Sequence, residues 1–325
     1  MKLRKLSNFF LGLPSKGLKA SRAALRKLSN FFLGLPSFVW LLIFYAIPIV
    51  LVFIIAFGFD DPLDFLYFLR NLFRGRIAGG TLENFKFLTK PTYQAIIWRT
   101  FWQGVVSTFV CVAIAIPVSY QLCRMSSKWK NIFLLLIIVP FWTNFLIRIF
   151  AWKIFLQSNG IFHRILEVIG LVEPQTNLLY NEWAVLTVMI YTYIPFAVLP
   201  IYAVAEKFDF ALLDAAKDLG ASSFYAFRKV FLPGISKGIW TAVMVVLIPA
   251  FGAYLIPSLV GGPTSELLGD KIAQNVFTNE NLPQASALSA LLMLAVFLPM
   301  VAIYWIKKVQ DSKAKQKNEE KGAVR

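Results

Sequence analysis

The sequence is poor in the residues from which most metal and redox sites are built. Among its 325 residues there are two cysteines, Cys111 and Cys123, and one histidine, His163. The cysteines are twelve positions apart in one apolar stretch, or about 18 Å if that stretch is helical, so they cannot form a disulfide with each other. No spacing typical of a metal site occurs either. We therefore predict no metal, no cofactor and no disulfide framework.

Motifs for nucleotide binding and catalysis are also missing. No G-x-x-x-x-G-K-[ST] string occurs, so the chain is not expected to bind a nucleoside triphosphate itself. One G-x-S-x-G string, Gly234–Gly238, lacks the preceding strand that a nucleophile elbow requires. We predict that the chain is not an enzyme, and that any ATP hydrolysis driving its function belongs to a separate polypeptide.

What the sequence has in abundance is apolar residues, at 58% of the chain with a mean hydropathy of +0.65. Six stretches reach the length of about 20 apolar residues that crosses a bilayer. Each contains proline, which kinks a membrane helix where neighbouring groups satisfy the freed backbone. The composition predicts an all-α, multi-pass integral membrane protein with spans at 38–58, 101–123, 131–156, 183–205, 236–258 and 285–306.

The basic residues, which outnumber the acidic ones by 33 to 17, are distributed unevenly around these spans. One side, formed by 1–37, 124–130, 206–238 and 307–325, holds 23 Lys and Arg, and the other side holds eight. Basic loops remain in the cytoplasm, so both termini and residues 206–238 are predicted to be cytoplasmic. The positive charge is thus explained by topology, and we predict no nucleic-acid partner.

The first 37 residues contain a tandem repeat. Residues 3–15 recur identically at 25–37. Each copy is basic and amphipathic and could lie among lipid headgroups, although a duplicated leader is the simpler interpretation. The predicted domains are a basic cytoplasmic segment at 1–37, a six-span domain at 38–306 and a basic cytoplasmic tail at 307–325.

The stretch 206–238 is a polar island between two spans. On a helix, its apolar residues and its charged residues fall on opposite sides. Asp209 is suited to cap the first helix, Gly220 to end it in a left-handed conformation, and Ser222 to cap a second helix that stops at Pro233. We predict two short amphipathic helices joined by a glycine bend. The apolar side comprises Phe208, Leu212, Ala215, Ala216 and Leu219, and the charged side Asp214, Lys217 and Asp218.

This stretch resembles the EAA loop of ABC importer permeases with a MetI-like transmembrane domain. The matching residues are Asp214, Ala215, Ala216, Gly220, Val230, Leu232 and Pro233, with Asp in place of Glu at 214 and Val in place of Ile at 230. The resemblance implies a six-helix type I permease in which residues 206–233 form the cytoplasmic coupling loop. It also implies that Asp214, Ala215, Ala216, Gly220, Leu232 and Pro233 dock into a groove of a separate ATPase subunit. An ordinary cytosolic loop is the alternative.

A second resemblance concerns the substrate. Residues 139–149, VPFWTNFLIRI, and the stretch from Tyr191 to Glu206 are similar to the permeases of bacterial spermidine/putrescine importers. This implies a polyamine received from a soluble substrate-binding protein at the bacterial inner membrane. It further implies a second, similar permease and two ATP-binding subunits as partners. Related permeases carry sulfate, ferric iron or thiamine, and these remain alternatives. A secondary transporter or channel would normally carry ionisable groups near the membrane midplane.

With no acidic residue in the spans, a path for a polycation has to offer aromatic faces and neutral acceptors. We predict Trp142, Asn144, Tyr191, Tyr193 and Tyr254 as candidates, with packing or interface anchoring as the alternative for each. Arg148, late in the third span, is a candidate for docking an acidic soluble partner. Snorkelling to the outer headgroups is its alternative interpretation.

Overall fold

The computed structural model describes residues 35–58, 83–170, 172–173, 176–297, 301 and 305. The N-terminal repeat and the basic tail that were predicted from the sequence lie outside these residues. The described part is helical throughout and contains no strand. It falls into two compact units, one ending at Ile55 and the other containing 56–58 and the residues from 83 onward, which are considered separately.

The described residues of the first unit belong to one apolar helix, Leu35–Ala56, which is 22 residues long. It contains a π-helical turn, η1 (Leu42–Ala46), followed directly by α3 (Ile47–Ala56). Its length suffices to cross a membrane, and it coincides with the predicted first span.

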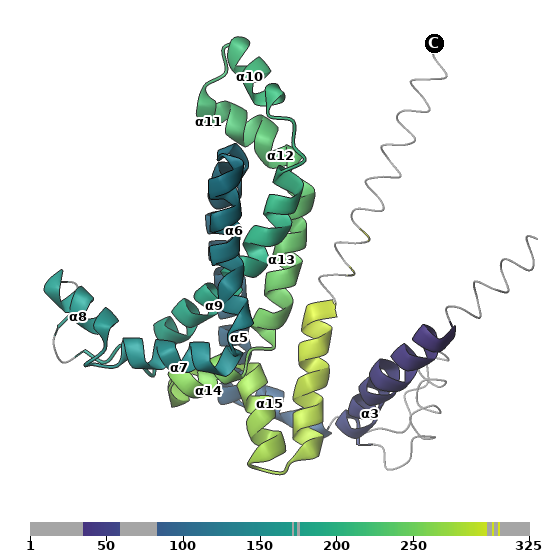
Figure 1. The fold of residues 1–325 in the computed structure, drawn as a ribbon. Coiled ribbons are helices and arrows are strands. Elements are labelled where there is room, and N and C mark those ends of the chain that lie inside the picture. Colours follow the sequence, from purple (N-terminus) through teal and green to yellow (C-terminus); the bar gives the residue numbers. More distant parts are fainter. Residues whose placement is uncertain are drawn as a thin grey trace, which may run out of the picture. The chain divides into compact units, whose positions relative to one another are not determined.

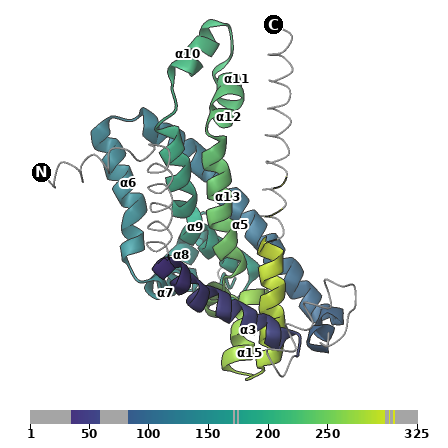
Figure 2. The same cartoon turned by 90° about the vertical axis from the view of Figure 1, so that its right-hand side faces the viewer.

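The centre of the second unit is a set of three helices, α5 (Pro91–Arg124), α9 (Glu182–Ala205) and α13 (Ser236–Phe251) (Figures 1 and 2). Small buried residues let α5 and α9 approach closely, as is usual in membrane bundles. The Ser119 hydroxyl donates to the Val198 carbonyl at 3.4 Å, and Ala115 and Ala197 are fully buried nearby. Helix α9 begins at Asn181, whose side-chain oxygen accepts from the Ala184 amide at 2.8 Å.

The predicted third span, 131–156, is divided between two helices. Helix α6 (Ser127–Trp142) ends shortly after Pro140, and α7 (Phe145–Leu156) begins in a new direction, so that the two halves meet at 98°. The side chain of Asn144 caps the new helix by accepting from the Leu146 amide at 2.8 Å. An apolar run has the same composition whether the helix is straight or bent, so the composition alone did not predict the break.

The fifth predicted span, 236–258, is also interrupted. Helix α13 ends at Phe251, and a short helix, α14 (Leu255–Val260), follows after three residues. A β-carbon at Gly269 would collide with the carbonyls of Gly252 and Ala253, so the next helix is packed directly on this break. The predicted fifth span therefore contains an interruption of its helix at 252–254.

The remaining elements are short. They are η2 (Glu83–Thr89), α8 (Ile161–Val168), α10 (Ala211–Asp218), α11 (Ser223–Ala226), η3 (Phe227–Phe231), α12 (Leu232–Gly234), η4 (Pro263–Ser265) and α15 (Leu268–Phe277). The last described helix, Leu282–Phe297, covers most of the predicted sixth span. Within the described residues, three helices are long enough to cross a membrane, and two bent pairs raise that number to five.

Candidate coupling site and translocation path

The polar stretch after α9 folds into two short helices at one end of the bundle, as the sequence predicted (Figure 2). Asp209 Oδ1 accepts from the Ala211 amide at 3.0 Å, and Ser222 Oγ accepts from the Tyr225 amide at 3.2 Å. Gly220 has φ of +88°, the left-handed conformation that favours glycine. The Ser222 cap and the glycine bend are thereby confirmed, whereas Asp209 lies one residue before the N-cap of α10, Phe210.

The packing of helix α10 differs from the prediction. Leu213 is buried and Ala216 packs on the core of the bundle, whereas Leu212, Ala215 and Leu219 are exposed. The predicted apolar side is therefore divided, and Ala216 does not share a face with Ala215. The reason is tertiary, because α10 packs on the bundle through Leu213, which the sequence analysis placed on neither side.

The outward side carries a cluster of exposed apolar side chains, which we call the loop's outer face. Leu219 is 90% exposed and Phe224 is 72% exposed. Exposed apolar patches are typical of surfaces that contact a protein, a membrane or a ligand. The outer face consists of Leu212, Ala215, Leu219, Phe224 and Tyr225.

An aromatic cluster joins this loop to α5. The ring of Tyr120 on α5 lies 5.0 Å from that of Phe231 and 5.3 Å from that of Phe227, both in edge-to-face contact. The π-helical turn η3 stacks Phe227 on Phe231, and Phe208 meets Phe231 edge-on at 5.3 Å. Such pairs prefer fixed geometries, so a displacement of the loop is expected to move the end of α5 with it.

Glu206, at the junction of α9 and the loop, is held by two other residues. Its Oε1 accepts from the Tyr202 hydroxyl at 2.6 Å and from Lys130 Nζ at 3.1 Å. The Tyr202 hydrogen bond, followed by that of Lys130, lowers the pKa of the Glu206 carboxyl. Lys130 belongs to α6, so this contact links α6 to the root of the loop. The sequence analysis did not identify the contact between Lys130 and Glu206.

Of the five candidate path residues, two are brought together. Tyr193 and Tyr254 line a cavity of about 140 Å³ at the break between α13 and α14, together with Phe145 and Pro249. The Tyr193 hydroxyl donates to the Pro249 carbonyl at 3.2 Å. Free backbone groups at such a break are tolerated in a membrane where they line a cavity.

The other three candidates lie elsewhere. Trp142 is 77% exposed at the end of α6, and the Asn144 oxygen is engaged in capping α7. Tyr191 packs on Trp152 of α7, with ring centroids 5.2 Å apart, rather than on Tyr193. Their part in a path stays a prediction.

Arg148 is folded onto aromatic rings. Its guanidinium carbon lies 5.4 Å from the Phe141 ring centre and 5.6 Å from that of Phe145, and its Nε is buried with no hydrogen-bond partner in the described part of the chain. A cation over an aromatic face is attracted to it. The docking role of Arg148 stays a prediction.

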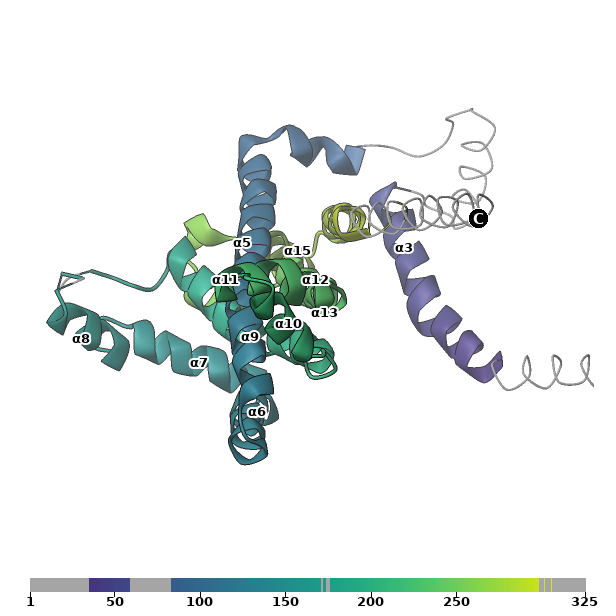
Figure 3. The ribbon, with the colours of Figure 1, turned by 90° about the horizontal axis from the view of Figure 1, so that it is seen from above.

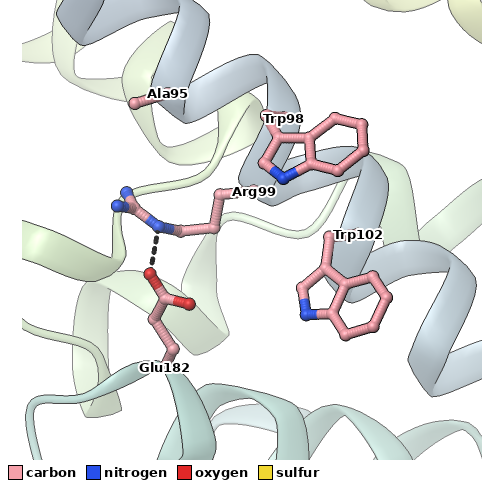
Figure 4. Close-up of a pocket in the computed structure, with 5 residues that line it drawn as sticks. All are labelled: Ala95, Trp98, Arg99, Trp102 and Glu182. Carbon is pink, nitrogen blue, oxygen red and sulfur yellow. Dashed lines mark hydrogen bonds and ion pairs between the residues drawn. The ribbon is translucent and has the colours of Figure 1, made fainter.

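A second cavity, of about 490 Å³, opens at the far end of α5 and α9 (Figure 4). Arg99 Nε donates to a carboxylate oxygen of Glu182 at 2.6 Å, and Arg99 Nη1 donates to the Glu266 carbonyl at 3.3 Å. Trp98 and Trp102, one turn apart, line the cavity beside this ion pair. Arg99 thereby ties α5 to α9 and to the segment before α15, a role that the sequence analysis missed.

Comparison with known proteins decides the family. The model of the family described as "Binding-protein-dependent transport system inner membrane component" matches residues 9–316. The chain belongs to this family. It is therefore a membrane component of an ABC-type transport system, and the predicted family is confirmed. The coupling role of residues 206–233 stays a prediction.

Curated relatives of this permease are similar along most of its length. It is 33% identical over 276 residues to the spermidine/putrescine transport system permease protein PotB of Haemophilus influenzae. The alignment covers 85% of this chain and 93% of the relative. It is 30% identical over 266 residues to PotB of Escherichia coli strain K12, covering 82% of this chain and 93% of the relative.

Solved structures share the fold of this permease. A bacterial ABC transporter involved in the import of the acidic polysaccharide alginate superimposes with a TM-score of 0.65 at 16% identity, covering 89% of this chain and 98% of the other. A bacterial alginate ABC transporter in complex with an alginate pentasaccharide-bound periplasmic protein superimposes with a TM-score of 0.59 at 17% identity. The match covers 85% of this chain and 93% of the other. At these identities the likeness shows an all-α ABC importer permease fold and nothing about substrate.

Proposed function

We propose that this permease carries a polyamine, spermidine or putrescine, across the bacterial inner membrane in an ATP-driven importer. The observation that carries the proposal is its 33% identity to a permease named for spermidine and putrescine over 93% of that protein. Permeases for sulfate, ferric iron or thiamine are the alternative.

The chemistry of the cavity at the α13–α14 break is compatible with a polycation. Tyr193, Tyr254 and Phe145 offer aromatic rings, and the Pro249 carbonyl offers an acceptor, while none of the described residues that line the cavity carries a carboxylate. A cation over an aromatic face gains roughly 0.5–2 kcal/mol, the larger value when dry. Such modest attraction suits passage better than tight binding.

Four partners follow from the proposal: a second permease, two ATPase subunits and a soluble substrate-binding protein. The loop of residues 206–233 is the ATPase contact in this scheme, with Asp214, Ala215, Ala216, Gly220, Leu232 and Pro233 as its defining residues. The aromatic cluster around Tyr120 would pass its movement to α5. ATP shifts the permease between two states only if the ATPases contact the loop differently in each.

Uptake measurements test the substrate. Cells lacking this permease should lose uptake of labelled putrescine, spermidine or both, and the intact chain should restore it. Sulfate, ferric iron and thiamine serve as controls and should enter equally with and without the permease. Normal polyamine uptake in the deletion strain, with a loss of one of the control solutes, would refute the polyamine assignment.

A further inference from the structure

Helices α7 and α8 form an arm that leaves the three-helix centre of the bundle sideways (Figures 1 and 3). The pair Ser127–Trp142 and Phe145–Val168 is bent by 98°, so the arm runs nearly perpendicular to α6. Trp152 holds the arm in place, because its ring contacts Phe162 of α8 at 6.2 Å and Tyr191 of α9 at 5.2 Å. The turn between α7 and α8 requires Gly160, where a β-carbon would collide with the Phe155 carbonyl.

On the polar side of α8, His163 is covered by protein, whereas Glu167 is exposed. His163 is fully buried, and its Nε2 donates to the Thr176 carbonyl at 2.9 Å. Glu167, one turn later, lies 3.9 Å from His163 Nδ1. Residues 176–179, which lead back to α9, therefore face the polar side of the helix.

The apolar side of α8 faces away from this segment and is uncovered within the described residues. Its four apolar side chains lie at the spacing of one helical face, and they are exposed to between half and nearly nine-tenths of their surface. These are Ile161 (66%), Ile165 (50%), Val168 (87%) and Ile169 (63%). On α7, Ile147, Phe150 and Ile154 are also exposed and lie at the spacing of one helical face.

We propose that the arm lies on the outer leaflet of the membrane, with the apolar side of α8 immersed at the boundary between lipid headgroups and acyl chains. Helices of this kind lie in the interface plane with one apolar face inserted. Arg164 is exposed at the edge of the apolar side, from which its guanidinium can reach a lipid phosphate. The assignment to the outer leaflet rests on the proposed topology.

Continuity with the membrane-facing surface identifies lipid as the occupant. The arm starts where α6 ends, and α6 carries exposed apolar side chains along its length, among them Leu135, Leu136 and Trp142. A helix that turns by 98° at the end of such a segment remains at the depth where the segment ended. An amphipathic helix at that depth finds hydrocarbon on one side and water on the other.

Fluorescence quenching tests this placement in the assembled transporter, reconstituted in lipid nanodiscs. Single cysteines are introduced as Ile165→Cys, Val168→Cys and, as the matched control on the polar side, Glu167→Cys, in a chain carrying Cys111→Ala and Cys123→Ala. Each is labelled with bimane. Lipids brominated near the headgroup should quench positions 165 and 168 at least about twofold more than position 167, and aqueous iodide should give the reverse order.

Three results would overturn the proposal. Equal quenching of 165 and 167 by brominated lipid would mean that the arm is not inserted. Protection of 165 and 168 from both quenchers would mean that another protein covers the face. Failure of a membrane-impermeant maleimide to label Glu167→Cys on intact cells would place the arm on the inner leaflet. Polyamine uptake is measured separately, so a wrong substrate leaves these outcomes unaffected.

Discussion

Gly220 is the residue on which the shape of the coupling loop depends most directly. Its φ is +88°, and no atom lies within 4 Å of the place where a β-carbon would be. A substitution there meets backbone strain alone, of about 1 kcal/mol. We expect Gly220→Ala to leave membrane levels unchanged, to reduce uptake, and to loosen the ATPase subunit during purification.

Gly170 provides a matched control for that experiment. It also has a positive φ, +79°, and among the described residues no atom lies within 4 Å of its β-carbon position, but it follows α8 rather than the loop of residues 206–233. Gly170→Ala should therefore retain uptake and ATPase association. Equal losses in the two variants would attribute the effect to strain in general and not to coupling.

Asp270 on α15 gives a prediction about pH. Burial raises the pKa of its carboxyl to about 6, and the neighbouring Glu266 adds to this. Because the folded pKa lies above the unfolded one, the folded state loses stability as pH rises from about 4 to about 6, by at most about 3 kcal/mol. Asp270→Asn should melt at a higher temperature than the natural chain at pH 7.5 and at a similar temperature at pH 4. A larger gain at pH 4 than at pH 7.5 would contradict this.

The residue-scale features predicted from sequence were those set by local chemistry. Asp209, Gly220 and Ser222 act within a few residues of their own position, so their roles were readable from spacing. The orientation of Ala216 could not be predicted from spacing, because it is fixed by packing against the bundle. Arg99 was missed for the same reason, since its partner Glu182 is 83 residues away.

At the scale of elements, the contact between α6 and the root of the loop has a testable role. An exposed ion pair contributes little to stability, so the Lys130–Glu206 contact should matter for transmitting movement more than for folding. We expect Lys130→Glu to raise the amount of ATP hydrolysed per polyamine imported. Combining it with Glu206→Lys should restore the ratio, because the pair is re-formed with its charges exchanged.

Lys128 is the control for this exchange. It lies on the same turn of α6, exposed, two residues before Lys130. Lys128→Glu makes the same change in charge and should leave the ratio of ATP to substrate unaltered. If Lys128→Glu raises the ratio as much as Lys130→Glu does, net charge at the cytoplasmic end of α6 is responsible, and the specific contact is not.

The sequence predicted which helices exist better than it predicted where those helices bend or are interrupted. Long apolar runs located the long helices of the described residues, and the polar island located the loop between α9 and α13. The count of six spans stays a prediction. The breaks at 143–144 and 252–254 were not predicted, although prolines at 140 and 249 precede them. Proline permits a bend, but the angle depends on what the second half packs against, and that information is distributed over distant residues.

At the scale of the whole molecule, charge asymmetry gives a prediction of orientation. The four segments assigned to the cytoplasm carry 23 Lys and Arg, and the three assigned to the outside carry eight. Translocating basic loops against the membrane potential is unfavourable, so the asymmetry fixes the insertion of the entire chain. Glu173, between α8 and α9, should then be outside, and Asp218, at the end of α10, should be inside.

Cysteine labelling in the full-length chain checks this orientation. In a variant carrying Cys111→Ala and Cys123→Ala, Glu173→Cys should react with a membrane-impermeant maleimide on intact cells. Asp218→Cys should react only after the membrane is permeabilised, because it lies on the side where the ATPases hydrolyse cytoplasmic ATP. Labelling of both positions from outside would contradict the prediction that the chain crosses the membrane once between them, through α9. The reverse pattern would keep that count and invert the molecule, which would leave the coupling loop on the side where no ATPase can reach it.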